Sequence, residues 1–128
     1  MLTDVRASLA ASDVERARRW YEEKLGLTPY ESWPGELLRF RVGQSGFSIY
    51  KTASAGTAKN TVAVFDVADL RAEVAAMRAR GVVFEEYDFG GGDKTVEGII
   101  ETDDGGLNAW FTDSEGNILA LAQLPTVA

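Results

Sequence analysis

The hydrophobic pattern of this chain changes period several times and then goes through the same changes again, which restricts the folds open to it. In each half, an alternating strand-like run precedes an amphipathic helical segment, and three or four further strand-like runs follow. A length of 128 residues corresponds to about one domain. We therefore predict one domain over residues 1–128, built from two repeats at about 1–55 and 60–126.

The first repeat begins with an alternating segment at 5–9, followed by a helix. Ser12 and Glu15 are spaced as in a capping box, and Gly26 is placed to end the helix in the left-handed conformation. The apolar stripe of this helix consists of Val14, Ala17, Tyr21 and Leu25. Strands are predicted after the helix at 27–33, 36–42 and 46–51.

The second repeat has the same order with a longer loop at 89–95. A strand at 61–67 precedes a helix that ends near Arg80 and Gly81. The apolar stripe of this helix consists of Leu70, Val74 and Met77, and later strands are predicted at 82–87, 98–102, 107–112 and 117–122. The pattern thus predicts an α+β fold of two βαβββ modules, whose curled mixed sheets each carry a helix on one face and enclose a cleft.

Histidine and cysteine are both absent from the sequence. Their absence excludes disulfides, thiolate nucleophiles, imidazole metal ligands and Ser-His-Asp relays. Any catalysis would therefore rest on carboxylates, lysine, arginine, tyrosine or water.

The charge is distributed unevenly along the chain. The first sixty residues carry nine basic and seven acidic side chains, whereas the remainder carries four basic and thirteen acidic ones, so the total is −7. An acidic chain is a poor partner for nucleic acid. With no predicted membrane span and no secretory signal pattern, we expect a cytoplasmic protein. The acidic half is either a solvated surface or a field that attracts a cationic small molecule.

Two segments carry a resemblance to a known family. They are 13–27, with Trp20-Tyr21 and Leu25-Gly26-Leu27, and 110–119, with Phe111-Thr112-Asp113 and Gly116-Asn117. Together they resemble the vicinal oxygen chelate superfamily, which comprises glyoxalases, bleomycin-resistance proteins and extradiol dioxygenases. Ser114 stands where this family commonly has proline.

The resemblance implies a divalent metal in the enzymes of that superfamily, held by one side chain from the first and one from the last strand of each module. The matching positions here are Arg6, Val62, Ala120 and a residue near Tyr50. Because arginine, valine and alanine do not ligate such a metal through their side chains, we predict no metal, no other cofactor and no catalytic residue. The chain is then most similar to the metal-free, dimeric bleomycin-resistance branch.

Strand alternation identifies the side chains that would line the cleft. If Arg6 faces the cleft, so do alternate residues of the other strands, and tryptophans on strands could stack on a ligand. The predicted ligand-binding residues are Arg6, Ser8, Trp33, Ser48, Tyr50, Val62, Val64, Trp110 and Ala120. Arg39 and Arg41 share one strand face, either as a clamp for a ligand carboxylate or as exterior residues that offset the acidic half.

The function predicted from these observations is metal-free binding of a small organic molecule, cationic or aromatic, by a homodimer, with antibiotic sequestration as one form of it. One alternative is a lyase, isomerase or dioxygenase with an atypical site, which either uses Arg6, Tyr50 and a carboxylate or recruits a metal through unexpected ligands. Another is a non-catalytic interaction module whose cleft is filled by its own side chains.

Overall fold

The computed structural model describes residues 1–125 and confirms the α+β class. Its contacts divide the chain into two compact units. Unit 1 contains Met1–Val62 and the short segment Asp113–Asn117, whereas unit 2 contains Ala63–Thr112 and the described residues from Ile118 onward. The second predicted repeat ended at residue 126, which lies outside the described residues.

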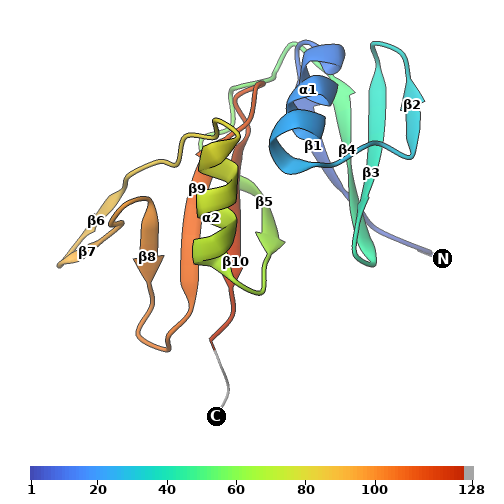
Figure 1. Ribbon diagram of the computed structural model, residues 1–128. Helices are drawn as coiled ribbons and strands as arrows, with labels where there is room; N and C mark the ends of the chain where they lie inside the picture. The colour runs from blue at the N-terminus through green and yellow to red at the C-terminus, as the bar shows by residue number, and fades with distance from the viewer. Residues whose placement is uncertain (126–128) are drawn as a thin grey trace. The chain divides into compact units, whose positions relative to one another are not determined.

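Unit 1 is a four-stranded mixed sheet with one helical segment against it (Figure 1). The strands, in the order in which they pair, are β1 (Ala7–Ala11), β4 (Ser45–Lys51), β3 (Leu37–Val42) and β2 (Glu31–Trp33). β1 and β4 are parallel, and the other pairs are antiparallel. The helix α1 (Val14–Trp20) continues into a π-helical turn, η1 (Tyr21–Leu25), and Gly26 ends it at a φ of 68° as predicted.

Unit 2 repeats this strand order around the helix α2 (Leu70–Ala79), which packs on its own sheet (Figure 1). The strands pair in the order β5 (Thr61–Asp66), β10 (Ile118–Gln123), β9 (Leu107–Thr112) and β8 (Ile99–Glu101). Two short strands, β6 (Asp88–Gly90) and β7 (Asp93–Lys94), form a separate hairpin. The βαβββ pattern is therefore present twice in the chain.

Aromatic packing dominates the core of unit 1. Tyr21, the first residue of η1, is fully buried between the helical segment and the sheet. Its ring centroid lies 5.5 Å from that of Phe40 and 5.7 Å from that of Phe47. The two phenylalanines, which pair across β3 and β4, stack at 4.8 Å. The other buried side chains of this core include Leu9, Ala11, Val14, Ala17, Leu38 and Ile49. One face of the sheet is thereby committed to the helix.

The core of unit 2 follows the same principle with aliphatic residues of the helix. The predicted stripe of Leu70, Val74 and Met77 is buried, as are Phe84, Ala109, Phe111, Leu119 and Leu121. Phe84 and Phe111 meet edge to face at 5.5 Å.

The structure corrects several predicted element boundaries. The predicted strand at 82–87 is reduced to a single bridge between Phe84 and Phe111, because the backbone of Tyr87 bonds to Thr95 rather than to β9. The predicted strand at 27–33 begins only at Glu31, since the Leu27 amide still donates to the Tyr21 carbonyl at the helix end. The first strand is Ala7–Ala11 rather than 5–9, and the predicted loop at 89–95 contains the β6–β7 hairpin.

The predicted capping box is wrong in both of its residues. The N-cap of α1 is Asp13, whose side chain accepts from the Arg16 amide, and Ser12 lies one residue outside the helix. The partner of the cap amide is not Glu15 but the distant Glu115, whose Oε1 accepts the Asp13 N–H at 2.9 Å. The capping role that the spacing assigned locally is filled by a residue about a hundred positions later.

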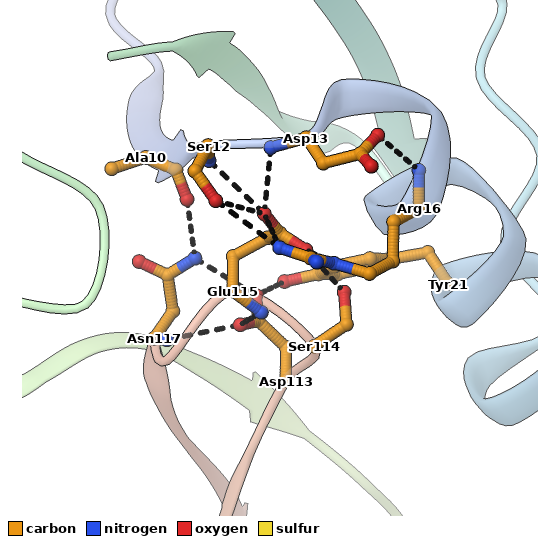
Figure 2. A network of polar contacts seen from close by, with 9 residues as sticks. All are labelled: Ala10, Ser12, Asp13, Arg16, Tyr21, Asp113, Ser114, Glu115 and Asn117. Carbon is orange, nitrogen blue, oxygen red and sulfur yellow. Dashed lines mark hydrogen bonds and ion pairs between the residues drawn. The ribbon is translucent and has the colours of Figure 1, made fainter. Parts of the chain in front are cut away.

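Glu115 belongs to the turn 113–117, which is part of unit 1 (Figure 2). Besides the Asp13 amide, its carboxylate accepts from the Ser12 amide at 3.0 Å and from the Arg16 guanidinium at 2.8 Å and 3.0 Å. Burial by itself raises the pKa of the Glu115 carboxyl, but these hydrogen bonds, with one from Ser114, outweigh burial and lower the pKa to about 2. The carboxylate is therefore the ionised centre of a polar network.

Asp113 organises the rest of this turn. Its Oδ1 accepts the amides of Glu115 and Asn117, and its Oδ2 accepts the Tyr21 hydroxyl at 2.6 Å. Asn117 donates from its side chain to the Ala10 carbonyl of β1. Burial, followed by the charge of Asp113, raises the pKa of the Tyr21 phenol well above its usual value, so this phenol stays a hydrogen-bond donor. The turn is thus bonded to both the first strand and the first helix (Figure 2).

We predict that this network makes stability fall with acidification. Because the pKa of Glu115 is lower in the folded state, its contribution is complete above pH 5 and is lost as the pH falls toward 2. A shift from 4.5 to about 2 corresponds to about 3 kcal/mol in the free energy of unfolding. Urea unfolding at pH 5 and pH 3 should show Glu115→Gln less stable than wild type at pH 5 and less sensitive to the change in pH.

Glu22→Gln is the matched control, because Glu22 is a partly exposed carboxylate of the same unit, paired with Arg18 on the helix surface. It should leave the pH dependence as in wild type. Equal pH slopes for wild type and Glu115→Gln would contradict the assigned role.

Candidate functional site

The face of the unit 1 sheet opposite α1 carries most of the polar residues predicted to bind a ligand. Residues that pair across neighbouring strands share a face, and the pairing places Ser8, Ser48 and Arg39 in one row. Tyr50 and Leu37 are paired in the next row. We call the set Ser8, Ala10, Glu31, Trp33, Leu37, Arg39, Arg41, Gly46, Ser48 and Tyr50 the polar face.

Arg39 is the central charged residue of the polar face. Its Nη1 lies 3.4 Å from Oε2 of Glu31, its partner in β2, and its guanidinium carbon lies 5.2 Å from the centre of the Trp33 ring. The Nε atom is buried, and among residues 1–125 nothing accepts its hydrogen. The strand pattern placed Arg39 opposite the buried Phe40, and the structure confirms that placement.

The neighbours of Arg39 combine a buried hydroxyl with exposed rings. Ser48, its partner in β4, is only 5% exposed. Trp33 is 47% and Tyr50 42% exposed, although both are large rings. Ser8, beside Ser48 in β1, is also exposed. Four of the predicted residues therefore lie on one surface of one unit.

Arg6 lies just before β1 and is exposed. It lines a cavity of about 670 Å³ together with Arg41, whose guanidinium stacks 4.5 Å above the Tyr30 ring. The rest of the lining is Asp4, Val5, Ala7, Phe40 and the turn 43–47. Of the nine residues predicted to bind a ligand, only Arg6 lines this cavity, so we place the candidate site on the polar face, which shares Arg41 and Gly46 with the cavity.

Unit 2 holds a second group of aromatic side chains. Trp110, which pairs with Ala120 across β9 and β10, has its ring centre 5.5 Å from that of Tyr87 and 5.6 Å from that of Phe89. Phe89 is 57% exposed, and Ala120 is buried. Burial, then the charge of nearby Glu85, raises the pKa of the Tyr87 phenol.

The two predicted valines of β5 differ in exposure. Val64 is exposed and Val62 half-buried. Val62 is grouped with unit 1 and Val64 with unit 2, and the role of both in binding stays a prediction.

The positions that the resemblance assigns to metal ligands do not fit a divalent metal. Arg6 is a cation, Val62 and Ala120 have no donor atom in their side chains, and Tyr50 supplies one phenol. Within residues 1–125, no three histidine, cysteine or acidic side chains are grouped closely enough to hold a metal ion. No step of a reaction is therefore assigned to a metal here.

Sequence reasoning missed three features of this region. It did not bring Arg39 together with Trp33 and Ser48, it did not predict the Tyr87 and Phe89 contacts with Trp110, and it treated Glu115 only as part of a family motif. Strand parity could have revealed the first, since the spacing of Arg39 and Ser48 from the intervening turn fixes their pairing. The other two depend on loops whose paths no periodicity specifies.

No helix within residues 1–125 combines the length and the apolar character needed to cross a membrane.

Comparison with known proteins identifies the fold. A family model described as the Glyoxalase/Bleomycin resistance protein/Dioxygenase superfamily matches residues 5–121. A search of curated protein sequences finds no match.

Several solved structures are similar over nearly the whole chain. A glyoxalase/bleomycin resistance protein from Catenulispora acidiphila is 19% identical with a TM-score of 0.70, covering 97% of this chain and 100% of that one. A lactoylglutathione lyase from Agrobacterium tumefaciens is 18% identical with a TM-score of 0.67, covering 96% and 94%. TnmS3, an antibiotic binding protein from Streptomyces sp. CB03234, is 21% identical with a TM-score of 0.63, covering 98% and 99%. At these identities the similarity establishes the fold alone.

Gly46, which pairs with Arg41 at one end of the polar face, yields a prediction. A Cβ at Gly46 would lie 2.6 Å from the carbonyl oxygen of Phe40, which is backbone in the paired strand and cannot rotate away. We expect Gly46→Ala to lower the free energy of unfolding by about 1–3 kcal/mol. Ser45→Ala, at the exposed start of the same strand, should stay within about 0.5 kcal/mol of wild type in the same urea titration. Equal stability of the two variants would contradict the close approach.

Proposed function

Since this chain belongs to the glyoxalase/bleomycin resistance protein/dioxygenase superfamily, we propose that it binds a small organic molecule without a metal ion, and that sequestration of an antibiotic is the specific form of this role. Some superfamily members, such as TnmS3, are antibiotic-binding proteins. The observation that carries the proposal is that the positions matching the metal ligands are filled by Arg6, Val62 and Ala120, whereas the polar face of unit 1 presents exposed rings.

The physical support comes from the side chains of the polar face. Trp33 and Tyr50 expose aromatic surface that would be buried by a flat ligand, and such burial is favourable by about 25 cal/mol per Å². The Ser48 hydroxyl and the Arg39 guanidinium supply a few polar points that would orient the ligand. Small-molecule sites combine these two kinds of surface.

Binding is tested by titrating the tryptophan fluorescence of the protein with metal-free bleomycin, doxorubicin and nalidixic acid. These probes represent a cationic antibiotic, a planar aromatic one and an aromatic acid. We expect a saturable change with at least one of them, because Trp33 is exposed on the polar face. The absence of saturation with all three would contradict the proposal.

The location of the site is tested by calorimetry with the probe that binds. Trp33→Ala should weaken binding about tenfold or more, as is usual for an aromatic anchor. Val83→Ala is the control, because Val83 is a strongly exposed apolar residue outside the polar face. If both variants bind like wild type, the polar face is not the site.

The metal-free character has a separate test. Binding should be unchanged after dialysis against EDTA and after addition of Mn²⁺ or Zn²⁺, because the side chains at the metal positions offer no ligand set. Loss of binding with EDTA, or stoichiometric metal in the purified protein by elemental analysis, would overturn this part of the proposal.

A further inference from the structure

We propose that the polar face of unit 1 selects ligands that carry a carboxylate attached to a planar ring, with Arg39 as the residue that recognises the acid group. This inference rests on the proposed function and specifies the chemical class of the ligand. It favours an anionic ligand over the cationic one that the acidic composition suggested.

The orientation of the Arg39 guanidinium leaves one of its edges for a ligand. Its Nη1 faces Glu31, so the opposite edge, formed by Nε and Nη2, remains for another acceptor. The Nε atom on that edge is buried, and no residue within 1–125 accepts its hydrogen. A guanidinium edge with two parallel N–H groups matches the two oxygens of a carboxylate.

Glu31 does not neutralise the guanidinium of Arg39. Its oxygen lies 3.4 Å from Nη1, longer than the 2.7–2.9 Å usual for a charge-assisted hydrogen bond, and its side chain is 45% exposed. An exposed ion pair at that distance is weak because water screens it. Arg39 therefore keeps most of its capacity for a second anion.

A row of paired residues that crosses the sheet at Arg39 offers a further hydrogen-bond donor. Ser48 pairs with Arg39 on one side and with Ser8 on the other. Ser48 itself is only 5% exposed, so its hydroxyl is held in a nearly buried position. A carboxylate on the Nε edge of Arg39 would find this hydroxyl as an additional donor from the neighbouring strand.

Two exposed aromatic rings lie on the same face as Arg39. Arg39 lies against one side of Trp33, which is still 47% exposed, and Tyr50 is 42% exposed in the row next to Ser48. A planar ring attached to the acid group would cover these apolar surfaces.

The charge around the polar face agrees with an anion. Arg41 lies on the same strand face as Arg39, and Arg6 shares the adjoining cavity with Arg41. The carboxylates of the chain are instead concentrated in 85–104, where eight acidic residues accompany Lys94. Local positive charge attracts an anionic ligand even when the whole protein is acidic.

The test compares three probes that share a naphthalene ring system and differ in charge: 2-naphthoate, 2-naphthamide and 2-naphthylmethylammonium. Isothermal titration calorimetry on the full chain should give a Kd for naphthoate about tenfold or more below that for the amide, as charge-assisted hydrogen bonds are stronger than neutral ones. Arg39→Gln should remove this preference, because naphthoate loses a charged partner whereas the amide loses only a neutral hydrogen bond. Arg19→Gln, an equal change of charge on the exposed surface of α1, should leave the preference intact.

Glu31→Gln provides a variant of opposite sign. It removes the negative charge beside Arg39, which repels a second carboxylate, so we expect tighter binding of naphthoate and a smaller effect on the uncharged amide. A merely structural role of the Arg39–Glu31 pair would not strengthen binding. This variant also decides the question if Arg39→Gln fails the check of folding by circular dichroism.

The outcomes separate the two proposals. If the amide or the ammonium compound binds as tightly as naphthoate, the assignment of Arg39 is overturned and the binding function stands. If none of the three saturates, the assignment is likewise overturned, and the antibiotic titration alone decides the binding function.

Discussion

The hydrogen bonds to the Glu115 carboxylate are the interactions on which the first unit depends. It accepts six hydrogen bonds from Ser12, Asp13, Arg16 and Ser114. It thereby holds the amide of the N-cap residue Asp13 and anchors its own turn to the start of the first helix. An ionised group is stable in so buried a position only when its hydrogen bonds outweigh the loss of hydration. The start of α1, the end of β1 and the turn 113–117 are consequently fixed as one polar assembly.

Fixing α1 on one face of its sheet determines what the other face can be. The helix takes the aromatic and aliphatic residues of alternate positions, including Phe40 and Phe47, and leaves the intervening positions of the same strands to the polar face. Pairing between strands then assembles Arg39, Ser48 and Tyr50 from segments that no local motif connects. The candidate site is thus a by-product of strand alternation on a half-covered sheet.

The superfamily fold is retained in this chain with side chains that do not suit metal chemistry. The relation to a lyase and to an antibiotic-binding protein of the same fold shows how one scaffold accommodates different roles. At the positions that the resemblance assigns to metal ligands, this chain has Arg6, Val62 and Ala120. The proposed binding function is based on those residues and on the polar face of unit 1.

The sequence by itself determined the α+β class, both helices with their buried stripes, the glycine stop at Gly26 and the face on which Arg39 lies, because these depend on periodicity and local backbone preference. It placed the helix cap wrongly, since Glu15 is near in sequence but Glu115 is the group that accepts the cap amide. Only the tertiary structure decided that cap, the row of Ser8, Ser48 and Arg39, and the unpaired Nε of Arg39. The physical reason is that each of them is a contact between segments far apart in the chain, whose register and packing no local pattern encodes.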